Sequence, residues 1–518
     1  MTLCEPESGG RILCIRLSGL GDVVHSLHAL ALLREYRPLA YVTWIVEERF
    51  ADLLEGHPQI DELITIPRSL WGRGLRNPLR WGEVLSEMAD LALSLRRRHF
   101  DASIDFQSSI KSAWLVASAA ADLRVGFAPP VCRELNHLVQ NHTVDVPRRG
   151  LHRVERDLAL LAPLAIPTRF ERAVLPCRRV HAAAVDELCP ETEKPLVVIH
   201  PGTSEYADFK RWEPERYGHV ATRLIEKCDA QVRVTFGPGE EALALRVVAA
   251  SGHRARLAPR LSHLQQLVHL IGRADLFLGS DTGPMHIAAA LKVPVVTLFG
   301  PKNAVGTGPY CTRNEVVTAD VDCRPCRRRS CPDRRCMHRI TPQQVFRAAE
   351  KVLGGGGKSR AGSGLVRSAC TTRFELGNSH GTIHTAFSSP AFYRFLAGME
   401  GERGMGWPKD RRLTCPTAEG KLAVRLRAAI RDDAGNWWKR LTGQVGLLNA
   451  WRTRVRMSRA GLCVSLPVCY AESGRLGHRR ETLVCSDVAG LEDFAGALER
   501  AADRERFLRG LAESLKRL

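Results

Sequence analysis

Short apolar runs alternate with helical patterns of apolar residues through about the first 350 positions of the chain. Runs of about four to eight apolar residues predict buried strands, and apolar residues spaced three and four apart predict helices. We expect strands at residues 11–17, 40–46, 62–66 and 100–106, and again at 195–200, 231–236, 274–278 and 293–300. Helices are expected at residues 23–34 and 110–119, from Glu213 onward, and at 341–353. This alternation predicts an α/β fold with parallel, doubly wound sheets covered on both faces.

The length of 518 residues exceeds what one hydrophobic core supports and predicts about three domains. We expect two Rossmann-like domains, residues 1–190 and 191–353, whose sheets face each other across a cleft. A Gly-rich segment, residues 354–374, is typical of a flexible linker and precedes a C-terminal α+β module over residues 375–518. Ligands of doubly wound sheets bind at the carboxyl ends of the strands, so the loops at those ends form the candidate site.

One such loop, residues 279–286 with the sequence GSDTGPMH, follows the strand at 274–278 and opens a helix. A helix that begins there leaves backbone N–H groups without intrahelical partners and points the positive end of its dipole at the cleft. The loop is therefore a candidate anion site, and a nucleotide diphosphate is the expected ligand. The alternative is an ordinary strand-to-helix turn in which Asp281 or Thr282 caps the helix.

The formal net charge of +19 is unevenly distributed along the chain. Residues 351–518 hold 29 Lys and Arg against 16 Asp and Glu, a net charge of +13. A basic surface suits nucleic acid, an anionic membrane or a phosphorylated substrate, and charge alone does not choose among them. Because the chain has no run of about 18 apolar residues and no N-terminal signal pattern, we expect a cytoplasmic protein. Its 16 cysteines should then be mostly reduced thiols.

Three motifs occur in the order and approximate spacing of a known family. They are SGLGDVVHSL at residues 18–27, KRW at residues 210–212, and DTGPMH at residues 281–286. Together they resemble the bacterial lipopolysaccharide heptosyltransferases of glycosyltransferase family nine, and the resemblance covers about residues 10–353. It implies a GT-B fold, in which two Rossmann-like domains face a cleft and the second binds the sugar nucleotide. It also implies that catalysis requires no metal ion or other cofactor.

Asp22 and Lys210 are the catalytic candidates. Asp22 follows two glycines, Gly19 and Gly21, that let the backbone turn sharply. The resemblance implies that Asp22 is the general base for the acceptor hydroxyl, a poor nucleophile until its proton begins to leave. The alternative is that Asp22 only caps the following helix. The resemblance also implies that Lys210 neutralises charge on the departing nucleoside diphosphate, whereas most lysines are simply solvated at the surface.

The donor-site candidates lie on strand-end loops of the second half. They are Thr203, Ser204, Glu240, Asp281, Thr282, Gly283 and His286. The resemblance implies that the amides of Thr282 and Gly283 hold the pyrophosphate, and that Thr203 and Ser204 hydrogen-bond the phosphates. Glu240 is the candidate for contact with the ribose, and Glu241 is the alternative.

The acceptor candidates lie in the first half, because the resemblance implies an acidic, phosphorylated glycolipid as the acceptor. They are Ser18, Gly19, Arg68, Lys111, Arg133 and Arg156. Arg68 follows a strand end and Lys111 starts a helix, so each can reach an anionic sugar. The alternative for each cation is a solvated surface residue, although the set as a whole suits an acidic ligand.

Four cysteines, Cys323, Cys326, Cys331 and Cys336, have the spacing of a metal site. A structural zinc ion is one expectation, and free thiols and a disulfide are the alternatives. Arginines surround the cluster and should depress the pKa values of the thiols, which favours metal binding and oxidation alike. A DNA-reading zinc module is not expected, because the cluster lies inside the transferase resemblance and no recognition helix follows it.

Residues 375–518 show a second resemblance, to the amino-terminal lobe of the lipopolysaccharide core kinases. It depends on residues 451–454 and 461–472, on Phe494, and on a basic terminal helix at 507–518. Arg425 and Ala450 stand where such a lobe carries a Lys–Glu pair, and no Gly-rich phosphate loop is evident. Phosphoryl transfer needs these parts, so we expect no kinase activity. The module is then either a truncated remnant or a basic lobe that helps hold the protein at anionic lipid.

The first resemblance implies an inverting glycosyltransferase that moves heptose from an ADP-heptose donor to the Kdo-containing inner core of a lipid A precursor. The expected protein is a cytoplasmic monomer, peripherally associated with the inner membrane, that binds no nucleic acid. Two alternatives stay open. One is a family-nine transferase that uses another nucleotide sugar, and the other is an inactive basic adaptor at anionic lipid or nucleic acid.

Overall fold

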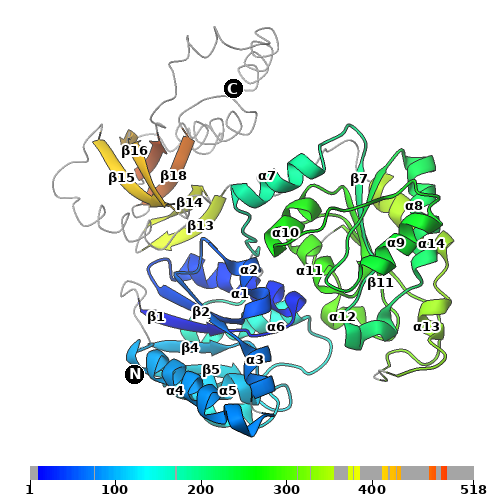
Figure 1. Ribbon diagram of the computed structural model, residues 1–518. Coiled ribbons are helices and arrows are strands. Elements are labelled where there is room, and N and C mark those ends of the chain that lie inside the picture. The colour runs from blue at the N-terminus through cyan, green and yellow to red at the C-terminus, as the bar shows by residue number, and fades with distance from the viewer. Residues whose placement is uncertain are drawn as a thin grey trace. The chain divides into compact units, whose positions relative to one another are not determined.

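The computed structural model describes residues 10–74, 76–169, 172–311, 313–326, 328 and 330–354, together with seven strands after residue 370. These residues form two compact units. The larger unit, Gly10–Leu33 and Val42–Ser368, contains two parallel sheets with the helices that cover them (Figure 1). The smaller unit contains the antiparallel strands of the C-terminal part. Every helix within the described ranges is too short or too polar to cross a membrane.

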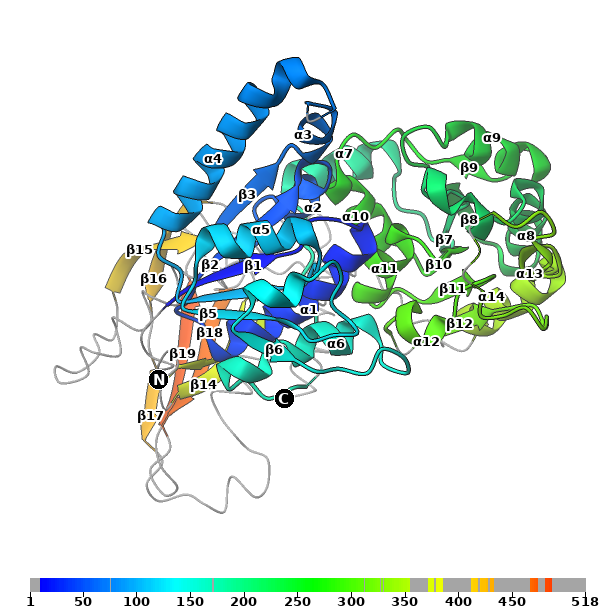
Figure 2. The ribbon, with the colours of Figure 1, turned by 90° about the horizontal axis from the view of Figure 1, so that it is seen from below.

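The first sheet of the larger unit has six parallel strands in the order β3-β2-β1-β4-β5-β6. Its strands are β1 (Arg11–Ile15), β2 (Tyr41–Glu47), β3 (Glu62–Ile66), β4 (Ala102–Asp105), β5 (Leu123–Phe127) and β6 (His142–Val144). Its helices are α1 (Leu20–Tyr36), α2 (Ala51–Leu54), α3 (Arg68–Gly74), α4 (Trp81–Arg97), α5 (Ile110–Ala119) and α6 (Arg153–Ala159). Leu95 of α4 and Leu115 of α5 pack with Leu13 and Ile15 on one face of the sheet. Helix α1 covers the opposite face (Figure 1, Figure 2).

The second sheet repeats this architecture in the order β12-β11-β10-β7-β8-β9. Its strands are β7 (Leu196–His200), β8 (Gln231–Val234), β9 (Arg256–Leu257), β10 (Leu276–Ser280), β11 (Val295–Leu298) and β12 (Asn314–Val317). The helices are α7 (Arg179–Leu188), α8 (Pro214–Cys228), α9 (Glu241–Ala250), α10 (Leu264–Gly272), α11 (Gly283–Ala290), α12 (Ala304–Thr307), α13 (Arg335–His338) and α14 (Pro342–Gly354). The strand order reverses beside β1 in one sheet and beside β7 in the other. Ligands of such sheets bind at the carboxyl ends of the strands at these switch points.

The predicted doubly wound α/β fold is confirmed, while several element ends lie a few residues from their predicted positions. The strand at 62–66 and the helix at 110–119 occur as predicted. The first helix begins at Leu20 rather than at residue 23, and the strand before it ends at Ile15 rather than at residue 17. The apolar pattern did not predict β5, β6, β9 and β12. These short strands lie at or next to sheet edges, where a strand needs no continuous apolar run.

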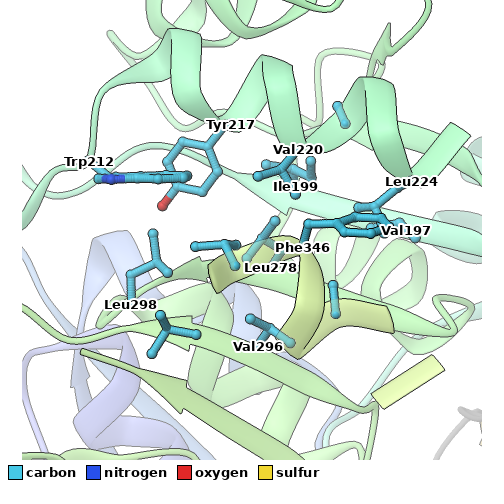
Figure 3. Packing of buried hydrophobic residues seen from close by; sticks show 14 of the residues in the cluster. Val197, Ile199, Trp212, Tyr217, Val220, Leu224, Leu278, Val296, Leu298 and Phe346 are labelled. Carbon is cyan, nitrogen blue, oxygen red and sulfur yellow. The ribbon is translucent and has the colours of Figure 1, made fainter. Parts of the chain in front are cut away.

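The core of the second half holds the Lys210 loop in place. Trp212 and Tyr217 are fully buried, and their rings meet edge to face with centroids 4.8 Å apart (Figure 3). The Trp212 indole N–H donates to the carbonyl of Ile340 at 3.1 Å, and the hydroxyls of Tyr217 and Ser280 lie 3.1 Å apart. Truncating a buried Trp to Ala typically costs about 3–5 kcal/mol. Trp212 therefore anchors the segment that carries Lys210, and Tyr217 anchors the end of β10.

The strands after residue 370 form two antiparallel sheets, one in the order β13-β14-β18-β19-β17 and one of β15 with β16. They are β13 (Thr371–Leu376), β14 (Ser379–His384), β15 (Arg411–Thr417), β16 (Gly420–Leu426), β17 (Ala429–Asp432), β18 (Leu466–Ser473) and β19 (Arg480–Ser486). Strand β13 begins within the last residues of the predicted linker, and Arg425 lies in β16. Outside the described residues lie 355–370 of the linker and the kinase-like positions Ala450, 451–454, Phe494 and 507–518.

Candidate active site

Asp22 lies in the first turn of α1, beyond the carboxyl end of β1. Gly19 has a positive φ of 86°, and the N–H of Val23 donates to its carbonyl at 2.8 Å, so the helix starts directly after this glycine. A Cβ at Gly19 would come within 2.7 Å of the Asp22 carboxylate, so the turn requires glycine there. Asp22 therefore projects from a helix rather than from the predicted loop. It stands after the helix start, so the alternative of a simple N-cap does not apply.

The first turns of α1 and α11 pack against each other between the two halves of the larger unit. A Cβ added at Gly21 would come within 2.2 Å of His286 Cδ2, and one added at Gly283 would come within 2.5 Å of Leu20 Cδ2. Each helix start thus fills the space that a glycine leaves in the other. Both helices point the positive end of the dipole toward this region, which favours an anion there.

Arg153 is the cation next to Asp22. From the first position of α6, its guanidinium donates to Asp22 Oδ1. Helix α6 is held by a buried cluster in which Arg16 and Ser26 donate to the Asp157 carboxylate at 3.1 Å and 2.7 Å. Burial alone would raise the pKa of the Asp22 carboxyl, but Arg153 and Arg16 outweigh it and hold this pKa below its usual value. Asp22 is therefore ionised at neutral pH and can accept a proton.

His25 lies one turn after Asp22 and is buried at the contact between the halves. Its Nε2 lies 3.0 Å from His286 Nδ1, and its Nδ1 lies 3.9 Å from Asp22 Oδ1. Burial, together with the neighbouring His286 and His152, holds the pKa of His25 well below its usual value, so the ring is neutral at pH 7. His152 makes a second contact between the halves, because its Nε2 donates to the carbonyl of Gly308 at 3.0 Å. Burial lowers the pKa of His152 to about 4.

Lys210, Asp281 and His286 form the part of the site that belongs to the second half. Lys210 Nζ lies 2.5 Å from Asp281 Oδ2, and His286 Nε2 lies 3.7 Å from Asp281 Oδ1. Burial would raise the pKa of Asp281, but His286 and Lys210 outweigh it, so this carboxyl is ionised. Asp22, His25, His286, Asp281 and Lys210 therefore form one continuous series of polar side chains between the two sheets.

The start of α11 supplies backbone donors beside this series. Thr282 stands at the N-cap, and its hydroxyl donates to the carbonyl of Ser280 at 3.3 Å rather than to the helix. Pro284 has no N–H, so the amides of Thr282 and Gly283 are the donors that precede it. Helix geometry gives these first amides no intrahelical acceptor, so they can bind an oxyanion.

Thr203 and Ser204 lie on the loop that leads to Lys210, but their side chains differ in accessibility. The Thr203 hydroxyl is buried and donates to the carbonyl of Ala207 at 3.1 Å, while Arg211 donates to the Thr203 carbonyl at 2.8 Å. Ser204 is exposed and precedes the 3-10 helix Glu205–Lys210. The Thr203 hydroxyl thus serves the loop itself in this structure, and its predicted contact with a phosphate stays a prediction.

Glu240 and Glu241 point to different surroundings. Glu240 accepts the N–H of Gly237 at 2.8 Å and lies 3.6 Å from His200 Nε2, at the carboxyl end of β7. Glu241 instead forms an ion pair with the exposed side chain of Arg260. Of the two candidates for the ribose, Glu240 is therefore the one placed at a strand end.

The predicted acceptor cations are distributed over several elements of the first half. Arg68 begins α3, Lys111 is exposed in the first turn of α5, and Arg133 is exposed. Arg156 donates to the carbonyl of Arg148 at 2.7 Å. Their roles toward the acceptor stay predictions.

Sequence reasoning missed four residues of the site: Gln107, Arg153, His25 and His152. Gln107 Oε1 accepts the N–H of Ser18 at 3.2 Å and so fixes the turn before α1. His25 could have been found, because a residue three positions after Asp22 lies on the same helix face. Arg153 follows the N-cap His152, and only the tertiary packing of α6 brings it to Asp22.

The four cysteines do not gather as a zinc site requires. Where the chain is described, no three of their sulfurs lie within 4.8 Å of one another, and all four thiols are free. Burial raises the pKa of the Cys336 thiol, and nearby Cys323 and Cys331 raise it further, contrary to the depressed value that the arginines suggested. The geometry therefore gives no support to the zinc expectation.

Within the described residues, ligand-like spacing occurs at Glu55, His181 and His263. His263 Nδ1 accepts the N–H of Gln265, so its Nε2 carries a proton and donates to Glu55 at 3.1 Å. The rings of His181 and His263 stack with centroids 3.7 Å apart, and nearly parallel rings cannot direct lone pairs at one ion. Arg178 already pairs with Glu55 at 2.7 Å. This cluster is a polar contact that joins the end of α2 to the starts of α7 and α10.

Comparison of the sequence with known proteins gives a consistent set of relatives. The family model of glycosyltransferase family 9 (heptosyltransferase) matches residues 88–336. Lipopolysaccharide heptosyltransferase 1 of Pseudomonas aeruginosa is 30% identical over 361 residues, covering 66% of this chain and 98% of that protein. Lipopolysaccharide core heptosyltransferase OpsX of Haemophilus influenzae is 28% identical over 309 residues, covering 59% of this chain and 84% of that protein.

Solved structures share the architecture of the larger unit. A glycosyl transferase family 9 protein from Veillonella parvula matches with a TM-score of 0.57 at 20% identity, covering 68% of this chain and all of that one. The E. coli heptosyltransferase WaaC with ADP matches with a TM-score of 0.54 at 23% identity, covering 66% of this chain and 99% of that one. These likenesses confirm the predicted two-sheet GT-B fold. The kinase-like resemblance of residues 375–518 stays a prediction.

Proposed function

This chain belongs to glycosyltransferase family 9, the family of the heptosyltransferases, and we propose that it transfers heptose from ADP-heptose to the inner core of a lipid A precursor. The observation that carries the proposal is the series of polar side chains from Asp22 to Lys210. It joins a carboxylate base to a cationic phosphate site, the two groups that glycosyl transfer to a hydroxyl needs. The names of the relatives, which are lipopolysaccharide heptosyltransferases, support heptose as the sugar.

In the proposed reaction Asp22 acts on the acceptor. Its carboxylate accepts the proton of the acceptor hydroxyl while the hydroxyl oxygen attacks the anomeric carbon of the donor. Arg153 keeps Asp22 ionised before the reaction, because its charge opposes the effect of burial on the pKa. Attack and departure occur on opposite sides of the anomeric carbon, so this direct displacement inverts the anomeric centre.

Lys210 and the start of α11 stabilise the leaving ADP. The Lys210 ammonium has three N–H donors, so it can bind a phosphate oxygen while it stays paired with Asp281. The amides of Thr282 and Gly283 add donors at the positive end of the helix dipole, where charge develops as the glycosidic bond breaks. This scheme uses only groups of the protein chain.

The test is transfer by the purified full-length protein. We expect a Kdo-lipid A acceptor incubated with ADP-heptose to gain the mass of one heptosyl residue, with an equal amount of ADP released. A panel of other nucleotide sugars runs in parallel. A product formed from another sugar but not from heptose would refute the heptose assignment, and no turnover of any sugar nucleotide would refute the transferase activity.

We also propose that one edge of the first half, formed by residues 73, 74 and 76–97, docks on the anionic membrane surface that holds the acceptor. Leu79 is 94% exposed, and Trp81 and Leu85 at the start of α4 are each about half exposed. Arg73 and Arg76 precede the apolar positions, while Arg96 and Arg97 add positive charge at the far end of α4. Exposed Trp and Leu beside arginines suit a surface of anionic lipid.

Vesicle binding tests this edge separately from catalysis. Burying one leucine contributes about 1.5–3 kcal/mol, so Leu79→Asp should weaken binding to phosphatidylglycerol-containing vesicles about tenfold or more. The same variant should keep the parent rate on a soluble, deacylated acceptor. The matched control is Leu245→Asp, because Leu245 is a half-exposed leucine on α9 of the second half. Vesicle binding by Leu79→Asp equal to that of the control would refute the assignment of this edge.

A further inference from the structure

We propose that His25 relays the acceptor proton from Asp22 toward the leaving diphosphate, through His286. The inference rests on the proposed transferase reaction and extends it by a path for the proton that Asp22 removes. His25 is buried between the base and the donor site, and the reaction scheme above gives it no task.

Two short gaps connect the members of the relay, and a third places its last ring beside the donor-site carboxylate of Asp281. Asp22 Oδ1 lies 3.9 Å from His25 Nδ1, His25 Nε2 lies 3.0 Å from His286 Nδ1, and His286 Nε2 lies 3.7 Å from Asp281 Oδ1. The middle gap is a hydrogen bond. The outer two exceed hydrogen-bond length by less than about 1 Å, and catalytic hydrogen bonds often tighten to full length only when substrate binds.

The protonation of the two rings gives the relay a direction. A neutral imidazole carries one N–H and one bare nitrogen. When His25 Nε2 donates to His286 Nδ1, the N–H of His286 is therefore on its Nε2. This N–H faces the donor site. In that arrangement His25 Nδ1 has a bare lone pair on the side of Asp22. This nitrogen is buried and has no hydrogen-bond partner among the described residues. An unsatisfied buried acceptor beside a base is placed to receive a proton from that base.

The charges around His25 favour passing the proton on rather than keeping it on the ring. The charged and titratable groups that face His25 are Asp22 and His28 on α1, His152 and Arg153 of the α6 end, and His286 on α11. Burial and the neighbouring rings lower the pKa of His25, so its ring holds an extra proton only transiently. Arg153 lowers the pKa of Asp22, so Asp22 is a weak base that releases the proton again.

The relay balances as a concerted set of proton transfers. The acceptor O–H bond breaks as its oxygen bonds to the anomeric carbon, and the proton goes to Asp22. Asp22 gives a proton to His25 Nδ1 while His25 Nε2 gives its own to His286 Nδ1. His286 Nε2 then gives its proton to a phosphate oxygen of the departing ADP. Solvent resets the two rings after the products leave, so no oxidant, reductant or further reactant is needed.

The test compares His25→Gln with His28→Gln in single-turnover transfer, measured across mixtures of H2O and D2O. Glutamine keeps hydrogen-bonding groups but cannot pass a proton through a ring. His28 is equally buried on the same helix, and its Nδ1 accepts the N–H of Ala173, which makes it the matched control. For the parent and for His28→Gln we expect a slower rate in D2O and a curved dependence on deuterium fraction, because several protons move together.

For His25→Gln we expect a transfer rate about 100-fold below that of the parent, which is at the lower end of what acid–base groups contribute. The rate of this variant should depend linearly on deuterium fraction. Affinity for ADP should stay at the parent value, because His25 does not bind the donor. A parent whose dependence is linear, or a His25→Gln variant that keeps the curvature or the parent rate, would overturn the relay alone. A parent that transfers no sugar would instead overturn the proposed function.

Discussion

Replacing Gly283 with alanine should separate the first turns of α1 and α11. The added Cβ would lie 2.5 Å from Leu20 Cδ2 and 2.7 Å from both Cβ and Cγ of Leu20. Carbon atoms in ordinary contact are about 3.5–4.0 Å apart. The tip of Leu20 can rotate away, but its Cβ is fixed to the helix backbone, so a change of rotamer does not relieve the overlap. The two helix starts must therefore move apart by about 1 Å.

A separation of this size acts on the groups that must cooperate in transfer. It lengthens the hydrogen bond of 3.0 Å between His25 and His286 and moves Asp22 away from the donor site. A misplacement of about 1 Å costs on the order of 100-fold in rate. We therefore expect Gly283→Ala to lower kcat/KM for ADP-heptose about 100-fold, although alanine keeps the backbone amide that faces the donor.

The assay is steady-state transfer to the lipid A-type acceptor, with thermal unfolding measured beside it. Leu20→Gly/Gly283→Ala removes the atoms that the new Cβ would meet. This double variant should therefore be faster than Gly283→Ala and nearly as fast as Leu20→Gly alone. Gly306→Ala is the control, because a Cβ at Gly306 meets no atom within 4 Å. A Gly283→Ala rate within about threefold of the parent, or a double variant no faster than Gly283→Ala, would refute the steric reasoning.

Three further predictions concern single side chains. Asp22→Asn and Lys210→Ala should each lower kcat at least about 100-fold, and turnover at the parent rate by either variant would contradict its catalytic assignment. The reaction needs ionised Asp22, so activity is lost as pH falls through the pKa of this carboxyl. Arg153→Gln removes the positive charge that lowers this pKa, and burial then raises it. The acidic limb of the kcat–pH profile should therefore move to higher pH in this variant. An unmoved limb would show that another group is the base. Glu240→Gln should weaken ADP binding in calorimetry, whereas Glu241→Gln should leave it within about twofold, and equal effects would remove the distinction between them.

The fold could be predicted because a parallel sheet covered on both faces needs apolar residues at nearly every strand position. β7 and β10 are buried along their whole length and were found within two residues of their ends. β9, with two residues, and the half-exposed edge strand β12 leave no comparable signal. Their pairing depends on the neighbouring strand rather than on their own composition.

The site could be predicted only where a motif carries it. Asp22, Lys210 and Asp281 lie in motifs, and the structure places each of them in one series of side chains. Arg153 is 131 residues from Asp22 in the sequence, and it reaches Asp22 because Arg16 holds α6 through Asp157. No local sequence pattern predicts a contact between residues so far apart in the chain.

The glycines before Asp22 show how one sequence feature can have two physical causes. Gly19 and Gly21 both suggested a sharp turn, and Gly19 does supply one through its positive φ. Gly21 lies within helix α1, and a Cβ there would overlap His286. Its lack of a side chain therefore serves the approach of α11 rather than the conformation of its own backbone. This distinction has a consequence: alanine at Gly21 should disturb catalysis through His286, whereas alanine at Gly19 should disturb the turn that starts α1.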